Sequence, residues 1–183
     1  MKYLSNETEI VFVGLNPTEQ ALKHNSVFCQ TATFWNILEQ SGIYPNMSTI
    51  KKHDDLAGGR YKDFAQIVFC GKLGFKDLVE DVFEKKANKV RVQKHHVEQL
   101  IRDIDSTSIK KLVLLGKGVF DSFQKHVNIA NSDSSKIEYG RVGVITLSSE
   151  GGKRDVEVFC MPFPETSPIP NKANYYKQII SKL

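Results

Sequence analysis

The residue of this sequence best suited to chemistry is an asparagine that follows a short apolar run. Asn16 stands in the stretch VFVGLNPT, residues 11–18. Gly14 allows a tight backbone where the run ends, and Pro17 fixes its own φ and restricts the residue before it, so the Asn16 amide is held rigidly. A rigid amide can orient a water molecule for attack on a substrate. The alternative is that Asn16 caps the turn through a hydrogen bond to nearby backbone.

The apolar run predicts the element that positions this amide. Residues 9–14 read as a buried strand, and ligands of open α/β sheets bind in the crevice beyond the carboxyl ends of such strands. Asn16 is therefore expected at a ligand crevice.

Strands and helices alternate along the rest of the chain. Apolar runs predict strands, and amphipathic stretches predict helices between them. Residues 142–147 are followed by the polar stretch SSEGGKRD, so they are expected to pair with 156–161 as a hairpin with a long turn. The alternation predicts an α/β fold, a three-layer α/β/α sandwich with a mostly parallel central sheet. The expected strands are 10–13, 66–70, 111–115, 142–147 and 156–161, and the expected helices are 33–40, 94–104, 118–126 and a terminal helix from 171.

Four further stretches follow the asparagine motif in a fixed order. They are FCQTATFWNIL from Phe28, GFKDLVED, KLVLLGKGVFDSF and FCMPFPETSPIPN. Together with GLNP they resemble the uracil-DNA glycosylase superfamily, in particular its mismatch-specific uracil/thymine branch. The first motif of that branch is Gly-Ile-Asn-Pro-Gly, with an aromatic residue and a Phe-Trp pair downstream. The resemblance spans nearly the whole chain and implies one uracil-DNA glycosylase-like domain over residues 1–183.

The resemblance implies hydrolysis of the bond between a base and deoxyribose in DNA. Such a reaction needs a water on the sugar face opposite the base, and hydrogen-bond donors for the charge that develops on the base. Asn16 would position the water, as the corresponding family asparagine does. The same loop would contact the base through Leu15, Pro17 and Thr18, with Glu19 as an assisting carboxylate.

Asp77 and Phe28 complete the pocket that the resemblance implies. Asp77, in GFKDLVED, takes the place of a family aspartate and would orient groups near the pocket, although a helix cap explains it as well. A base inside a duplex must be extruded before it can react, and an aromatic side chain replaces the lost stacking. Phe28 matches the family position for that side chain.

The proline-rich stretch near the end of the chain resembles the second family motif, commonly Pro-Ser-Thr-Ser-Pro. The resemblance implies that Thr166 and Ser167 contact DNA phosphates, that Pro168 stiffens the loop, and that Ile169 enters the gap left by the extruded nucleotide. A purely structural loop is the alternative.

A basic run between residues 85 and 94 is the other candidate DNA contact. Its side chains Lys85, Lys89 and Arg91 would reach phosphates from a loop. A solvated surface is the alternative, because runs of charge are usually no more than that.

The sequence departs from the family pattern at two of these positions. Thr18 replaces a glycine that would let a ligand approach the backbone closely. Glu165 replaces a small hydroxyl residue, and a carboxylate aimed at a phosphate is repulsive. Two other functions therefore stay open: a non-catalytic nucleic-acid-binding protein of the same fold, and a hydrolase that acts on a free nucleoside.

Composition limits the remaining classes. The chain has 183 residues, enough for one substantial core, and a net charge of +4 that permits a nucleic-acid partner without arguing for one. Its three cysteines are too few for the four-cysteine iron-sulfur cluster of some related branches, and the five histidines lack metal-ligand spacing, so we expect no metal and no cofactor. With no signal peptide and no apolar span long enough for a membrane, we expect a cytoplasmic monomer that binds DNA carrying a damaged or mismatched base.

Overall fold

Five strands form one sheet in this computed structural model, which describes residues 3–24, 33–43, 72–84, 86–131, 138–149, 152–165 and 167–180. The sheet order is β2-β1-β3-β5-β4. The first four of these run parallel, and β4 pairs antiparallel with β5 at one edge. The prediction of a mostly parallel sheet is thereby confirmed. The strands are β1 (Ile10–Gly14), β2 (Leu73–Asp77), β3 (Lys111–Leu115), β4 (Gly140–Ser149) and β5 (Gly152–Met161).

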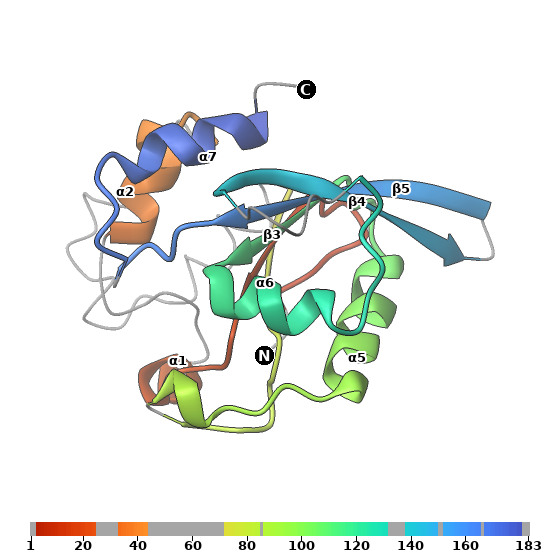
Figure 1. The fold of residues 1–183 in the computed structure, drawn as a ribbon, viewed down its shortest axis with the longest axis horizontal. Coiled ribbons are helices and arrows are strands. Elements are labelled where there is room, and N and C mark those ends of the chain that lie inside the picture. The colour runs from red at the N-terminus through yellow and green to blue at the C-terminus, as the bar shows by residue number, and fades with distance from the viewer. Residues whose placement is uncertain are drawn as a thin grey trace.

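Helices cover both faces of the sheet (Figure 1). The helices α2 (Thr33–Gln40) and α7 (Lys172–Ile180) pack together on one face. The helices α5 (Lys94–Asp105) and α6 (Lys117–Gln124) pack on the other. The expected three-layer α/β/α sandwich is therefore present. A short helix α1 (Glu19–His24) follows β1, and a 3-10 turn η1 (Ala87–Lys89) follows β2.

Side chains alternate between the two faces along β1, as a strand requires. Val11 and Val13 contribute to the core beneath α5 and α6, whereas Phe12 contributes to the core beneath α2 and α7. The Phe12 ring lies 5.4 Å from the ring of Phe34 on α2 and 5.5 Å from that of Phe75 on β2. Both distances are favourable for aromatic pairs. This packing holds β1, which leads into Asn16, against a helix and a neighbouring strand.

One of the two strands that pair with β1 was not among those expected. The predicted strand 66–70 lies outside the described residues, and the strand that pairs with β1 on the side opposite β3 is Leu73–Asp77. Gly74 and Lys76 interrupt its apolar pattern. Lys76 is nonetheless buried, because its Nζ lies 2.8 Å from Asp103 Oδ2 and 2.6 Å from Glu80 Oε2. Burial of a charge is tolerated only with such partners.

The hairpin of β4 and β5 differs from expectation in its turn. The polar stretch expected as a long turn belongs largely to the strands, which pair as far as Ser149 and Gly152. The Thr146 hydroxyl lies 2.7 Å from Asp155 Oδ1, so polar side chains pair across the exposed part of the ribbon. Antiparallel ribbons tolerate polar residues where a face meets water.

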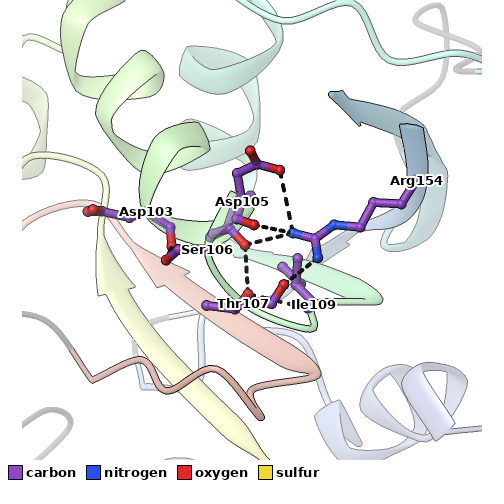
Figure 2. A network of polar contacts seen from close by, with 7 residues as sticks. Asp103, Asp105, Ser106, Thr107, Ile109 and Arg154 are labelled. Atoms are coloured by element: carbon purple, nitrogen blue, oxygen red, sulfur yellow. Dashed lines mark hydrogen bonds and ion pairs between the residues drawn. The ribbon is translucent and has the colours of Figure 1, made fainter. Parts of the chain in front are cut away.

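An arginine on β5 joins the hairpin to the turn that follows α5 (Figure 2). Arg154 donates to the carbonyl oxygens of Ile104 at 3.0 Å, of Asp105 at 2.9 Å, and of Thr107. Its Nη2 also lies 3.6 Å from the Asp105 carboxylate. The last carbonyls of a helix have no partner within it, so a guanidinium here satisfies them.

One of the three cysteines lies in the described part of the chain. Cys160 is a free, buried thiol, and burial raises its pKa to about 12. Burial and the raised pKa make it an unreactive core residue. Cys29 and Cys70 lie outside the described residues.

Candidate functional site

The carboxyl ends of four parallel strands meet at one edge of the sheet. The register pairs Gly14 of β1 with Asp77 of β2, and Leu115 of β3 with Met161 of β5. The loops that follow these strands therefore emerge side by side. They carry the asparagine motif, the segment after Asp77, the start of α6 and the proline-rich loop. We call this edge the carboxyl edge, and it brings together sequence motifs that are far apart in the chain.

Asn16 is tied to the segment that follows β2. Its Nδ2 donates to the carbonyl oxygen of Glu84 at 3.0 Å, and also lies 3.5 Å from that of Val82 and 3.3 Å from that of Pro17. These contacts fix which way the amide faces. No hydrogen bond from the described residues reaches its Oδ1, and the side chain is only half-buried. The oxygen is thus available as an acceptor for a water molecule or a ligand.

Gly14 provides room for a carboxyl group. A Cβ at this position would lie 2.6 Å from Oδ1 of Asp77, which real contacts do not allow. Gly14 is not among the positive-φ glycines of the structure, so the expected role in a tight backbone is not what requires it. A larger residue at 14 would push Asp77 out of place. The glycine of the motif and the aspartate that ends β2 therefore form one arrangement.

The Asp77 carboxyl group is largely removed from water. Burial raises its pKa to about 7, with a further increase from Glu80 and an opposing effect from Lys76. Near neutral pH a large share of these carboxyl groups is therefore protonated. A protonated carboxylic acid offers one hydrogen-bond donor and one acceptor. Asp77 can accordingly donate a hydrogen bond or a proton beside the asparagine loop.

The other side chains of the asparagine loop are engaged in structure. Leu15 packs on the core beneath α5 and α6, and Pro17 is buried. The Thr18 hydroxyl accepts a hydrogen bond from the backbone N–H of Ala21 at 3.1 Å and so caps α1. Glu19 is exposed in the first turn of that helix.

The segment after β2 is held at several points along its length. The backbone N–H of Leu78 donates to Gly14 at 2.9 Å, and that of Val79 donates to Leu15 at 2.8 Å. Farther along, Asp81 Oδ1 lies 3.5 Å from Nε2 of His96, near the start of α5. Together with the Asn16 contacts, these bonds fix the position of residues 78–84 against the asparagine loop.

The proline-rich loop is held by α7 and by an aromatic residue. Tyr176 of α7 donates to the carbonyl oxygen of Pro162 at 3.0 Å. The Ser167 hydroxyl shares a hydrogen bond with the Tyr139 hydroxyl, and Ile169 is half-buried. Pro168 is exposed, and Thr166 lies outside the described residues. The loop thus stands at the carboxyl edge, but its one described hydroxyl already has a partner.

The predicted base-stacking and phosphate-binding residues are described in part. Phe28 and Lys85 lie outside the described residues. Lys89, on η1, and Arg91 are exposed in the segment between β2 and α5, which emerges from the carboxyl edge.

Sequence reasoning overlooked the exposed pair Val82 and Phe83. Both side chains stand in the segment that Asn16 holds. Two adjacent apolar residues, separated from a basic run only by Glu84, were the available signal.

The part of the chain that the structure describes contains neither a candidate metal cluster nor a candidate membrane-spanning helix. No cluster of three or more histidine, cysteine, aspartate or glutamate side chains in this part of the chain could hold a metal ion. None of its helices is long and apolar enough to cross a membrane.

Comparison with known proteins assigns a family to the whole chain. A family model described as the uracil DNA glycosylase superfamily matches residues 1–183. A comparison with curated proteins found no match. The matched range includes the asparagine loop, Asp77 and the proline-rich loop.

Proposed function

Because this chain belongs to the uracil-DNA glycosylase superfamily, we propose that it hydrolyses the N-glycosidic bond of uracil, or of a related damaged or mismatched base, in DNA. Members of this superfamily are typically DNA N-glycosylases. The observation that best supports the proposal is the Asn16 amide at the carboxyl edge, whose orientation is fixed by hydrogen bonds to backbone carbonyl oxygens. The activity would belong to base-excision repair, with the mismatch-specific uracil/thymine branch as the nearest in motif.

Asn16 would hold the attacking water. Its Nδ2 is fixed by backbone carbonyls, so its Oδ1 presents a fixed acceptor to one water hydrogen. The water oxygen then bonds to the anomeric carbon as the bond from that carbon to the base nitrogen breaks and the sugar gains oxocarbenium character; the base leaves with the bonding electron pair, and the proton that the water loses passes through solvent to the base. An amide is a weak base, so its contribution is placement of the water rather than removal of its proton. Glu19, three residues after Asn16 in the chain, would be the assisting carboxylate.

Asp77 would act on the departing base. In its protonated form the carboxyl group donates a hydrogen bond to the negative charge that develops there. Backbone groups of Leu15, Pro17 and Thr18 would supply the remaining contacts to the base. Phe28 would stack on it.

DNA would be held by the two loops on either side of the asparagine loop. In this proposal Thr166, Ser167, Pro168 and Ile169 contact the strand around the extruded nucleotide. The basic residues Lys85, Lys89 and Arg91 contact phosphates on the β2 side of the site.

The test is base release from labelled oligonucleotides. The protein is incubated with uracil in a single strand or opposite guanine, and abasic sites are then cleaved with alkali. We expect strand scission by the parent and at least about a hundredfold less by Asn16→Ala, since a misplaced water costs this much. DNA binding by this variant is measured in parallel. Asn128→Ala, which removes an exposed amide beyond α6, is the matched control and should match the parent.

The outcomes separate the three functions. Equal activity of Asn16→Ala and the parent would remove Asn16 from the mechanism. Salt-sensitive DNA binding without release of any base would favour a non-catalytic nucleic-acid-binding protein. Turnover of a free nucleoside with none on oligonucleotides would favour a nucleoside hydrolase.

A further inference from the structure

Two adjacent apolar side chains project into solvent next to the candidate site. Val82 is 41% exposed and Phe83 is 43% exposed, and among the described residues only Leu22 on α1 is a comparably exposed large hydrophobic residue. The Asn16 amide contacts the carbonyl oxygens of Val82 and Glu84, the residues on either side of Phe83. Phe83 therefore lies between two residues whose carbonyl oxygens contact the Asn16 amide, and these contacts hold its backbone next to the candidate site.

The exposure of Phe83 is not the result of a loose segment. Residues 78 and 79 are hydrogen-bonded to the asparagine loop, and Asp81 faces His96. The ring makes no aromatic contact within the described part of the chain. An aromatic side chain of this size is normally buried, because leaving its surface in water has a cost in free energy. The Phe83 ring is thus exposed to solvent on a backbone segment that hydrogen bonds hold in place.

The basic side chains that follow Phe83 in the chain favour an anionic partner. Of the carboxylates near Phe83, Glu80 pairs with Lys76, whereas Asp81 and Glu84 keep their charge, since Asp81 contacts His96, whose pKa burial lowers, and Glu84 accepts a hydrogen bond from the backbone N–H of Lys86. The basic side chains that follow are exposed and form no ion pair with the described residues. They are Lys86, Lys89 and Arg91.

We propose that Phe83 stacks on an unpaired nucleobase that flanks the nucleotide in the candidate site, with Val82 supporting the ring and Lys86, Lys89 and Arg91 contacting the phosphates. A flat ring surrounded by cations suits a base attached to a phosphate backbone. A base within an intact duplex is already stacked on both faces. The contact therefore favours single-stranded or locally opened DNA. This inference rests on the proposed function, because it takes the nucleotide at Asn16 as its reference point.

The test uses an oligonucleotide that binds but does not react. A single strand carries 2'-fluoro-2'-deoxyuridine, whose glycosidic bond resists hydrolysis, and the fluorescent base 2-aminopurine beside it. Stacking of Phe83 on 2-aminopurine should quench its fluorescence. The variants are Phe83→Ala, Phe83→Leu, which keeps apolar bulk without a ring, and Phe83→Tyr, which keeps the ring. Leu22→Ala is the matched control, because it removes a similarly exposed apolar side chain from α1.

We expect strand binding and fluorescence quenching to depend on the aromatic ring at position 83. Phe83→Ala and Phe83→Leu should bind the single strand about tenfold more weakly and lose the quenching, whereas Phe83→Tyr and Leu22→Ala should keep both. Parent-like binding and quenching by Phe83→Leu would overturn the proposal. Loss of binding in Phe83→Ala alone, with Phe83→Leu unaffected, would also overturn it and would indicate an apolar contact with the strand that does not need an aromatic ring.

Base release from a reactive uracil strand separates this proposal from the glycosylase function. Release by the parent, with no effect of Phe83 on binding, would reject the stacking contact and leave the activity standing. Quenching that depends on the ring, without release of any base, would support the stacking contact and reject the activity. Thermal unfolding of each variant confirms that it is folded, which is expected because Phe83 lies at the surface.

Discussion

At the residue scale, the nitrogen and the oxygen of the Asn16 side-chain amide have different roles. Asn16 uses its Nδ2 to hold the backbone of the segment after β2, and this leaves its Oδ1 for a water molecule or ligand. An aspartate at this position would turn a second acceptor oxygen toward carbonyl oxygens, which repel it. The requirement for an amide can therefore be explained by the structure around it as well as by the reaction.

Asp77 makes a testable link between pH and stability. Burial raises its pKa from an ordinary value of 3.8 to about 7, so between these pH values the folded protein binds more protons than the unfolded chain. The free energy of unfolding should therefore fall as the pH rises through this window. Asp77→Asn cannot ionise and should be more stable than the parent at pH 8, by at most about 4 kcal/mol because each pKa unit corresponds to about 1.4 kcal/mol, with little advantage at pH 4.

Urea unfolding of both proteins from pH 4 to pH 8 measures this difference. Asp155→Asn, which removes an exposed carboxylate from β5, is the control and should show no such trend. A constant difference between Asp77→Asn and the parent across the range would contradict a raised pKa. If the protonated form also assists the departing base, the rate of base release by the parent should fall as the pH rises through about 7, the pKa of Asp77 in the folded protein.

Single residues were predicted from the sequence only where the local pattern determines them. Asn16 was identified because an apolar run, a glycine and a proline surround it. The reason why position 14 must be a glycine was not visible in the sequence. It depends on Asp77, which comes 63 positions later in the chain and pairs with Gly14 across β1 and β2. Phe83 was overlooked for a similar reason, since its exposure depends on contacts between separate loops.

At the scale of elements, a buried ion pair joins β2 to α5. Lys76 is almost fully buried and contacts Asp103 and Glu80. Lys76→Met would leave the buried Asp103 carboxylate without this cation, and we expect a loss of about 3 kcal/mol in unfolding free energy. Denaturant titration gives the value.

A second substitution distinguishes this ion pair from simple packing. In the double variant Lys76→Met with Asp103→Leu both charges are absent, and most of the lost stability should return. If the double variant is no more stable than Lys76→Met, the unpaired carboxylate is not the source of the loss.

The buried Lys76 also explains why β2 was not predicted from the sequence. Strands with four consecutive apolar residues, such as β1 and β3, were recognised because the burial of those residues is encoded in their types. In β2 a glycine and a lysine occupy buried positions, and the lysine is tolerated only because α5 supplies Asp103. Tertiary partners of this kind are not visible in a local pattern.

At the scale of the whole molecule, the parallel sheet separates the site from a major stabilising network. The candidate site lies at the carboxyl edge, whereas Arg154 stands near the start of β5 and binds the turn after α5 (Figure 2). Loops of parallel sheets at the carboxyl ends vary for function, and the opposite edge is available for stability. Activity and stability should therefore respond to different substitutions.

Arg154→Met tests this separation. It removes charge-assisted hydrogen bonds to the carbonyl oxygens of Ile104, Asp105 and Thr107, and we expect a loss of about 2 kcal/mol in unfolding free energy. Arg141→Met, which breaks the half-exposed pair with Glu157 on the same hairpin, should cost less than about 1 kcal/mol. Well below the melting temperature, both variants should bind DNA and release base like the parent. A selective loss of activity in Arg154→Met at full folding would mean that the turn after α5 is coupled to the carboxyl edge, since no direct contact with the site is available to Arg154.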